Sequence, residues 1–139
     1  MLATTQLFVN LPVRDLKKSM EFFTRLGFSF NPEFSDENGA CMLVGKDSFV
    51  MLLAKPFFKS FTKKELADSA ATTETILAFS VNSREAVDEM VRKALAAGGK
   101  PSNDKIEEAS MYGWSFQDLD DHLWEVFYME VNAAQIEKP

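Results

Sequence analysis

The sequence predicts an α+β fold in which two β-α-β-β-β modules enclose a cleft. Apolar residues alternate with a period of two near both ends of each half of the chain, as in half-buried strands. After the first strand of each half, apolar residues instead recur at helical spacing. Residues 11–15 also superpose on residues 79–83, an offset of 68 residues that is about half of the chain. An internal repeat at this offset predicts two equivalent sheets around a shared cleft.

Length and composition favour one packed domain. The chain has 139 residues, of which 46% are hydrophobic and thirteen are Phe, enough for an ordinary core rich in aromatic side chains. We therefore predict a single domain over 1–139, with module one at about 5–55, a connection at 56–73 and module two at about 74–131.

Charge and composition exclude several classes of function. A net charge of −6 repels nucleic acid and anionic membranes but would attract a cationic small molecule. No apolar run approaches the roughly 18 residues that a membrane span needs. The one cysteine, Cys41, cannot form an internal disulfide, and no leader-like segment opens the chain, so we expect a cytoplasmic protein. With one His in the chain, a Cys/His zinc site or a Ser/His/Asp triad would have to use His122.

Module one begins with a strand and a helix. The alternation over 7–13 predicts a strand, which Pro12 places near an edge or an end of its sheet. Asp15 is placed to cap a helix whose apolar residues recur at positions 16, 20, 23 and 26, and Gly27 is a natural terminator. Three short strands are predicted after it, at 28–34, 40–45 and 48–54.

The segment from Pro56 to Thr73 interrupts this pattern. It holds Phe57, Phe58 and Phe61, followed by a weak helical signal over 63–71 without a strong apolar face. We expect a mobile connection, in which the three Phe side chains either pin the segment to the core or line a ligand cavity as a lid.

Module two repeats the order of module one. A strand is predicted over 76–81, then a helix capped by Ser83 and ended by Gly98 and Gly99, then a weaker strand within 100–109. A β-hairpin closes the module, with strands at 112–117 and 123–129. Its five-residue turn contains three carboxylates and His122, and we expect a solvated turn there. The strand aromatics predicted to lie in the core are Phe79, Phe116, Trp124 and Phe127.

The last strand contains one residue that needs an explanation, Glu125. By the period of two, both faces of this strand are apolar except for this carboxylate. Burying a lone carboxylate is costly unless it is paired, binds a metal or is neutralised. Desolvation would also raise its pKa toward the range of a general acid or base.

Two stretches resemble signatures of a known family. Residues 8–28, Phe8-Val-Asn-Leu-Pro-Val-Arg-Asp-Leu-Lys-Lys-Ser-Met-Glu-Phe-Phe-Thr-Arg-Leu-Gly-Phe28, resemble the opening signature of the vicinal-oxygen-chelate superfamily. Residues 118–125, Asp118-Leu-Asp-Asp-His-Leu-Trp-Glu125, resemble its closing signature. This superfamily includes glyoxalase I, extradiol dioxygenases, fosfomycin-resistance enzymes and bleomycin-resistance proteins, and the chain looks most like small bacterial predicted lactoylglutathione lyases. The resemblance implies the two-module fold and, because family members commonly pair modules, a homodimer.

The resemblance also implies four metal-ligand positions, two in each module. They fall on Phe8, about Met51, Ile76 and Glu125, so only the last retains a ligand side chain. Phenyl, thioether and alkyl groups supply no nitrogen or oxygen, so we expect no family-type divalent metal and no other cofactor. His122 is expected to be a surface residue of the turn, and Cys41 a small core residue.

These positions predict a metal-independent site for a small molecule in an aromatic-lined cleft. Glu125 could act there as an acid or base in a lyase or isomerase reaction, which resembles lactoylglutathione lyase. It could instead bind a cationic ligand, as in the bleomycin-resistance proteins, or form a structural pair with a neighbouring donor. The residues predicted to line the site are Phe8, Met51, Phe57, Phe58, Phe61, Ile76, Trp114 and Glu125.

Overall fold

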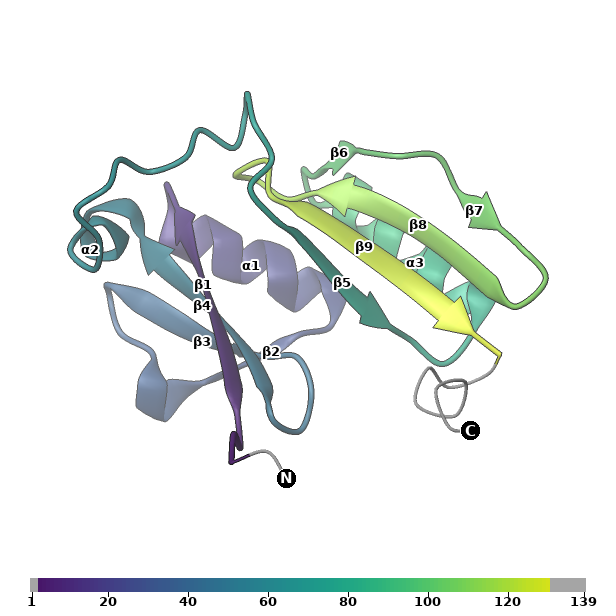
Figure 1. Cartoon of the computed structure of the whole chain (residues 1–139), viewed down its shortest axis with the longest axis horizontal. Helices are drawn as coiled ribbons and strands as arrows, with labels where there is room; N and C mark the ends of the chain where they lie inside the picture. The colour runs from purple at the N-terminus through teal and green to yellow at the C-terminus, as the bar shows by residue number, and fades with distance from the viewer. Residues whose placement is uncertain (1–2, 131–139) are drawn as a thin grey trace. The chain divides into compact units, whose positions relative to one another are not determined.

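Two mixed sheets contain the strands of this computed structural model, which describes residues 3–130 (Figure 1). The chain divides into two units, one up to Asp68 and one from Ser69 onward. This boundary lies inside the connection predicted at 56–73. The α+β class and the two-module organisation are confirmed, and each unit is described by itself below.

The first unit is a four-stranded sheet with the order β1-β4-β3-β2. The first strand pairs in parallel with the last, and the other two pairings are antiparallel. β1 therefore lies at an edge, where a proline is tolerated, as Pro12 predicts. The elements are β1 (Leu7–Val13), α1 (Leu16–Leu26), β2 (Ser29–Asn31), the 3₁₀ helix η1 (Pro32–Phe34), β3 (Gly39–Leu43), β4 (Ser48–Ala54) and α2 (Lys55–Lys59).

Helix α1 begins and ends where the sequence predicts. The Asp15 carboxylate accepts a hydrogen bond from the backbone N–H of Lys18 at 3.1 Å, and Gly27 ends the helix at a φ of 108°, which favours glycine. Phe22, Phe23 and Leu26 are buried, so this helix supplies the core on one face of the first sheet.

Two predicted elements of the first unit differ from the structure. The strand expected over 28–34 stops at Asn31, because Pro32 starts a 3₁₀ turn and the Asn31 side chain accepts a hydrogen bond from Glu33 N at 3.0 Å. The connection begins with α2 instead of an irregular segment, whereas the helix suggested over 63–71 is absent from this described stretch. Pro56 lies in the first turn of α2, where its missing N–H costs no hydrogen bond.

The second unit repeats this topology, with the order β5-β9-β8-β6 and a short extra strand, β7, that also pairs with β8. Its first strand is again parallel to its last, so the predicted internal repeat is confirmed. The single weak strand expected within 100–109 is two strands of two residues each. The elements are β5 (Ile76–Ser80), α3 (Arg84–Ala96), β6 (Lys100–Pro101), β7 (Ile106–Glu107), β8 (Met111–Gln117) and β9 (Leu123–Met129).

Helix α3 and the β8-β9 hairpin build the second core. Ser83 caps α3 by accepting a hydrogen bond from Ala86 N at 3.1 Å. Phe116 and Trp124 pair across the hairpin with parallel rings and are fully buried, as predicted. Phe79 and Phe127 are only half-buried, although the Phe79 ring contacts that of Trp124 edge to face.

Two predictions for the hairpin turn are wrong, namely that the turn is solvated and that His122 is a surface residue. Its polar side chains are buried instead. Asp118 is 2% exposed, and His122 is also buried. One Asp118 oxygen accepts hydrogen bonds from the backbone N–H groups of Asp120 at 2.8 Å and His122 at 3.0 Å, and the other accepts from the Trp124 indole at 2.9 Å. Three donors converge on one carboxylate, so the turn can be buried with its polar groups paired.

Candidate functional site

The two faces of the first sheet differ in what covers them. Along β1 and β4, Leu11, Val13, Val50 and Leu52 are buried on the face that packs against α1. The residues between them point to the opposite face, because side chains alternate along a strand. Asn10 of β1 lies beside Met51 of β4 in this register, and both belong to that second face.

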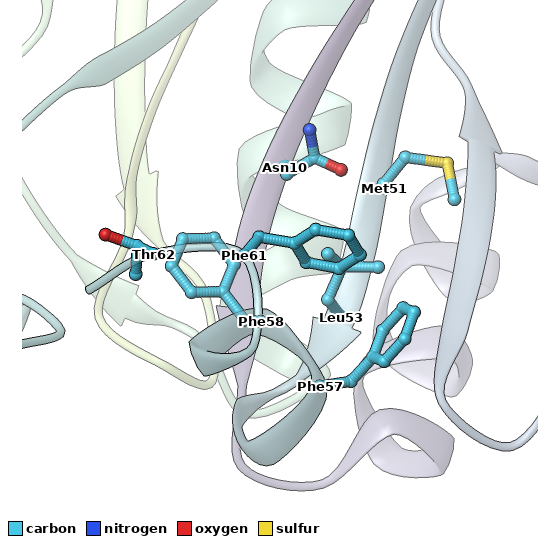
Figure 2. A pocket seen from close by; sticks show the side chains of 7 residues that line it. All are labelled: Asn10, Met51, Leu53, Phe57, Phe58, Phe61 and Thr62. Atoms are coloured by element: carbon cyan, nitrogen blue, oxygen red, sulfur yellow. The ribbon is translucent and has the colours of Figure 1, made fainter. Parts of the chain in front are cut away.

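A pocket of about 490 Å³ lies on this second face, between the sheet and α2. Asn10, Met51 and Leu53 come from β1 and β4, whereas the phenylalanines come from α2 and the segment directly after it (Figure 2). A volume of this size suits a small organic molecule. The lining residues are Asn10, Met51, Leu53, Phe57, Phe58, Phe61 and Thr62.

Polar groups are few in the pocket. The Asn10 amide and the Thr62 hydroxyl are the polar side chains among the seven lining residues, and none of the seven is ionisable. A mostly apolar cavity with a small number of polar groups is typical of ligand-binding sites, because burial supplies affinity and the polar groups fix orientation. The rings of Phe57 and Phe61 meet edge to face, with centroids 5.0 Å apart.

Gly39 of β3 makes room for one wall of the pocket. A Cβ built at Gly39 would lie 2.7 Å from Leu53 Cδ2, closer than real Cβ atoms approach other heavy atoms. Glycine therefore leaves room for the Leu53 side chain, which lines the pocket.

Of the eight residues predicted to line a site, the structure brings four together in this pocket: Met51, Phe57, Phe58 and Phe61. The three phenylalanines of the connection thus line a pocket, whereas their role as a lid over a ligand stays a prediction. Phe8 lies on the same sheet face but outside the lining, stacked on Phe49 with a centroid distance of 4.8 Å.

The other predicted residues lie in the second unit. Glu125 on β9 is flanked by Ala78 of β5 and Ser115 of β8, and Ile76 shares its sheet face. Trp114 pairs instead with Val126, on the face covered by α3, so the hairpin directs Trp114 and Glu125 to opposite faces. The Trp114 ring contacts the Lys105 ammonium, 4.6 Å from the ring centroid.

Glu125 is less buried than the sequence suggests. The β9 residues on its face, Glu125 included, are half-buried, whereas the alternate residues Trp124 and Val126 are fully buried. Within residues 3–130 no hydrogen bond or ion pair joins its carboxylate to another side chain or to the backbone. The structural pair considered for Glu125 therefore has no counterpart in the described part of the chain.

The sheet registers relate the two units at the ligand positions that the family resemblance implies. Asn10 lies opposite Met51 in the first unit, and Ala78 lies opposite Glu125 in the second, with Asn10 and Ala78 related by the 68-residue offset. Met51 is therefore the counterpart of Glu125. A thioether and a carboxylate at these positions, with Phe8 and Ile76 at the other two, do not fit a divalent metal. Among residues 3–130 there is also no group of three or more His, Cys, Asp or Glu side chains suited to hold one.

Three lining residues, Asn10, Leu53 and Thr62, were not predicted from the sequence. Asn10 and Leu53 were detectable in principle, because they share the period-two face of Phe8 and Met51. Thr62 lies after α2 in a segment without a sequence pattern, so only the three-dimensional structure reveals it.

Two further properties concern the burial of Cys41 and the length and hydropathy of the described helices. Cys41 is buried, as predicted, and burial raises the pKa of its thiol, which disfavours the nucleophilic thiolate. None of the helices within residues 3–130 is long and apolar enough to cross a membrane.

The fold resembles that of glyoxalase and bleomycin-resistance proteins, and its first unit carries an aromatic pocket. A family model described as bleomycin resistance protein-like N-terminal matches residues 5–45. With the structural neighbours below, this match supports the vicinal-oxygen-chelate superfamily that the sequence predicts. A comparison with curated proteins finds no match.

Solved structures of this fold resemble the chain along most of its length. A hypothetical protein from S. aureus is 28% identical with a TM-score of 0.76, over 92% of this chain and 94% of that one. A glyoxalase/bleomycin resistance protein/dioxygenase family enzyme from Burkholderia phytofirmans PsJN is 20% identical with a TM-score of 0.72, over 88% and 96%. A fosfomycin resistance protein from Listeria monocytogenes, in complex with Mn(II) and sulfate, is 19% identical with a TM-score of 0.67, over 94% of each chain.

Proposed function

We propose that this protein binds a small organic molecule in the pocket between the first sheet and α2, without a metal ion. The observation that carries this proposal is the lining of the pocket, in which three phenylalanine rings and two aliphatic or thioether side chains surround a volume of about 490 Å³. Aromatic side chains are rigid and bury large apolar areas, so they provide affinity at low entropic cost. The donor chemistry of Phe8, Met51 and Ile76 supports the metal-independent part of the proposal.

Binding can be measured with N-phenyl-1-naphthylamine, an uncharged probe whose fluorescence rises in apolar surroundings. Phe61→Ala should weaken its binding at least tenfold, because a large part of the aromatic wall is removed. Phe34→Ala is the matched control, since Phe34 is 64% exposed and Phe61 68% exposed, but Phe34 does not line the pocket. Equal affinities for the two variants would contradict the proposal.

Metal independence has its own test. Adding zinc, nickel or manganese, or treating the protein with a chelator, should leave probe affinity unchanged. Near-stoichiometric metal by elemental analysis of protein purified without a metal-binding tag would overturn the metal-independent reading.

A second candidate function is a lyase or isomerase reaction with Glu125 as the acid or base. It is favoured by one observation, a half-buried carboxylate without a hydrogen-bond or ion-pair partner among residues 3–130. Turnover of the methylglyoxal-glutathione adduct that is lost in Glu125→Gln, with the fold retained, would establish this function. Stoichiometric ligand binding without turnover in the unmodified protein would exclude it for that substrate.

We further propose one glyoxalase-like domain that forms a homodimer and works in the cytoplasm. The family resemblance supports the dimer, and a single buried cysteine suits a reducing compartment. The net charge of −6 disfavours nucleic acid as a partner. Light scattering coupled to size exclusion tests the dimer, and a monomer at micromolar concentration would contradict it.

A further inference from the structure

We propose that Asn10 makes the pocket selective for uncharged, planar aromatic molecules that carry an amide-like edge, with a carbonyl next to an N–H. This inference rests on the proposed function and names the ligand class for the same pocket. It differs from the cationic ligand that the overall charge and Glu125 suggest from the sequence.

The charges around the pocket argue against a cation. None of the seven lining residues is ionisable, so a charged ligand would lose water without gaining a counter-charge. The segment 55–64, which contains α2 and supplies four of the lining residues, has four lysines and no acidic residue. These lysines are exposed and would repel a cation at close range.

The same lysines do not form an anion site within the pocket. No lysine is among the lining residues, and the Lys59 ammonium donates a hydrogen bond to the backbone carbonyl of Lys64. That hydrogen bond holds the Lys59 side chain against its own segment. The lysines would therefore attract an anionic ligand from a distance, but no positive charge in the pocket would pair with it. An uncharged ligand is thus the best match.

The arrangement of the rings favours a planar aromatic body. Phe57 and Phe61 are nearly perpendicular, at 83°, so they present both a ring edge and a ring face. An aromatic ligand can stack on one ring and meet the other edge to face, the two geometries that aromatic pairs prefer. Met51 adds a polarisable sulfur, which also makes favourable contacts with aromatic rings.

Asn10 supplies the polar recognition. Its side-chain amide offers one acceptor and two donors, the complement of a ligand carbonyl beside an N–H. Asn10 makes no side-chain hydrogen bond to another residue in the described part of the chain, so its amide is available to a ligand. It also projects from β1, which is held in register by β4 over seven residue pairs, so the amide is presented from a rigid element (Figure 2).

Calorimetry with a matched series of bicyclic probes tests the selectivity. 2-Quinolone carries the neutral carbonyl and N–H edge, N-methyl-2-quinolone lacks the N–H, quinoline lacks both groups, and 1-methylquinolinium and quinoline-2-carboxylate carry opposite charges. We expect 2-quinolone to bind about fivefold to tenfold more tightly than its N-methyl derivative, the effect of one net hydrogen bond. Both charged probes should bind at least tenfold more weakly than 2-quinolone.

Variants at Asn10 assign the effect to this side chain. Asn10→Leu should abolish the preference for 2-quinolone over N-methyl-2-quinolone, measured as the ratio of the two affinities in this variant. Asn10→Asp should improve the binding of 1-methylquinolinium, because it places a carboxylate in the pocket. Asn82→Asp is the control, since it makes the same charge change at an exposed position in the second unit.

The outcomes separate this inference from the proposed function. If the probes bind and Phe61→Ala weakens all of them, but the quinolone preference is absent or survives in Asn10→Leu, the inference is wrong and the proposed function stands. Preferential binding of 1-methylquinolinium by the unmodified protein would also overturn it. If no probe of the series and no N-phenyl-1-naphthylamine binds at millimolar concentration, both proposals fail.

Discussion

The two units share one topology but present different chemistry on equivalent positions. Asn10 and Met51 of the first unit correspond to Ala78 and Glu125 of the second. Residues 1–68 contain nine basic and eight acidic side chains, whereas residues 69–139 contain six and thirteen, so the acidic character of the chain belongs to its second half. A duplicated backbone therefore does not imply a duplicated site, because the side chains on the sheet face decide what each unit can bind.

The last turn of each sheet shows the same contrast. The residues between β3 and β4, from 44 to 47, are exposed apart from one half-buried position. The turn between β8 and β9 is instead organised by the buried Asp118 carboxylate and its three N–H donors. The second unit thus depends on a buried polar cluster at a place where the first does not.

The largest expected effect is on this cluster. Asp118→Ala should lower the free energy of unfolding by about 3 kcal/mol, because it leaves buried backbone and indole N–H groups without an acceptor. Asp47→Ala, in the exposed turn of the first unit, should cost less than about 0.5 kcal/mol. Urea denaturation of both variants measures the difference, and similar losses would remove the contrast between the turns.

Helix capping should instead be equivalent in the two units. Asp15 and Ser83 are related by the 68-residue offset, and each accepts a hydrogen bond from the third residue after it at 3.1 Å. Asp15→Ala and Ser83→Ala should each lower the unfolding free energy by about 1 kcal/mol. A loss more than twice as large in one variant, measured by urea denaturation, would show that the modules tolerate helix fraying differently.

A smaller effect is expected at Glu125. Because this carboxylate is half-buried and unpaired among residues 3–130, Glu125→Gln should change the unfolding free energy by less than about 0.5 kcal/mol. Met51→Leu, at the corresponding position of the first unit, is the volume-conserving control. Thermal unfolding can compare the two, and a loss above 1 kcal/mol in Glu125→Gln would restore the structural role for this residue.

The smallest expected effect is a pH dependence from Asp118. Burial raises the pKa of Asp118 above its ordinary value, although the electrostatic interaction with His122 and the three N–H donors oppose this rise. The folded state then binds more protons than the unfolded state between the two pKa values, so the contribution of Asp118 to stability is largest below about pH 4 and is lost as pH rises through the folded-state pKa. The stability difference between the unmodified protein and Asp118→Asn should therefore decrease with rising pH. An increase would contradict a raised pKa for Asp118.

Local signals in the sequence were enough to predict most elements. The strand from Leu7 to Val13, helix α1 with its Asp15 cap and Gly27 terminator, and the strand from Leu123 to Met129 all match their predicted bounds. Alternation, caps and terminators act over a few residues, so they can be detected without tertiary contacts. The opposite orientations of Trp114 and Glu125 also follow from alternation once the hairpin register is known.

Burial of polar residues and assembly of the pocket depend on the tertiary structure. His122 and Asp118 have the composition of a solvated turn, and only the convergence of three donors on one carboxylate makes their burial favourable. The pocket likewise forms because α2 places Phe57 and Phe58 opposite the sheet, next to Asn10. The sequence by itself determined the two-module fold, since its elements depend on residue type and spacing. Tertiary packing decided where the pocket lies, because that depends on which side chains face one another across different elements.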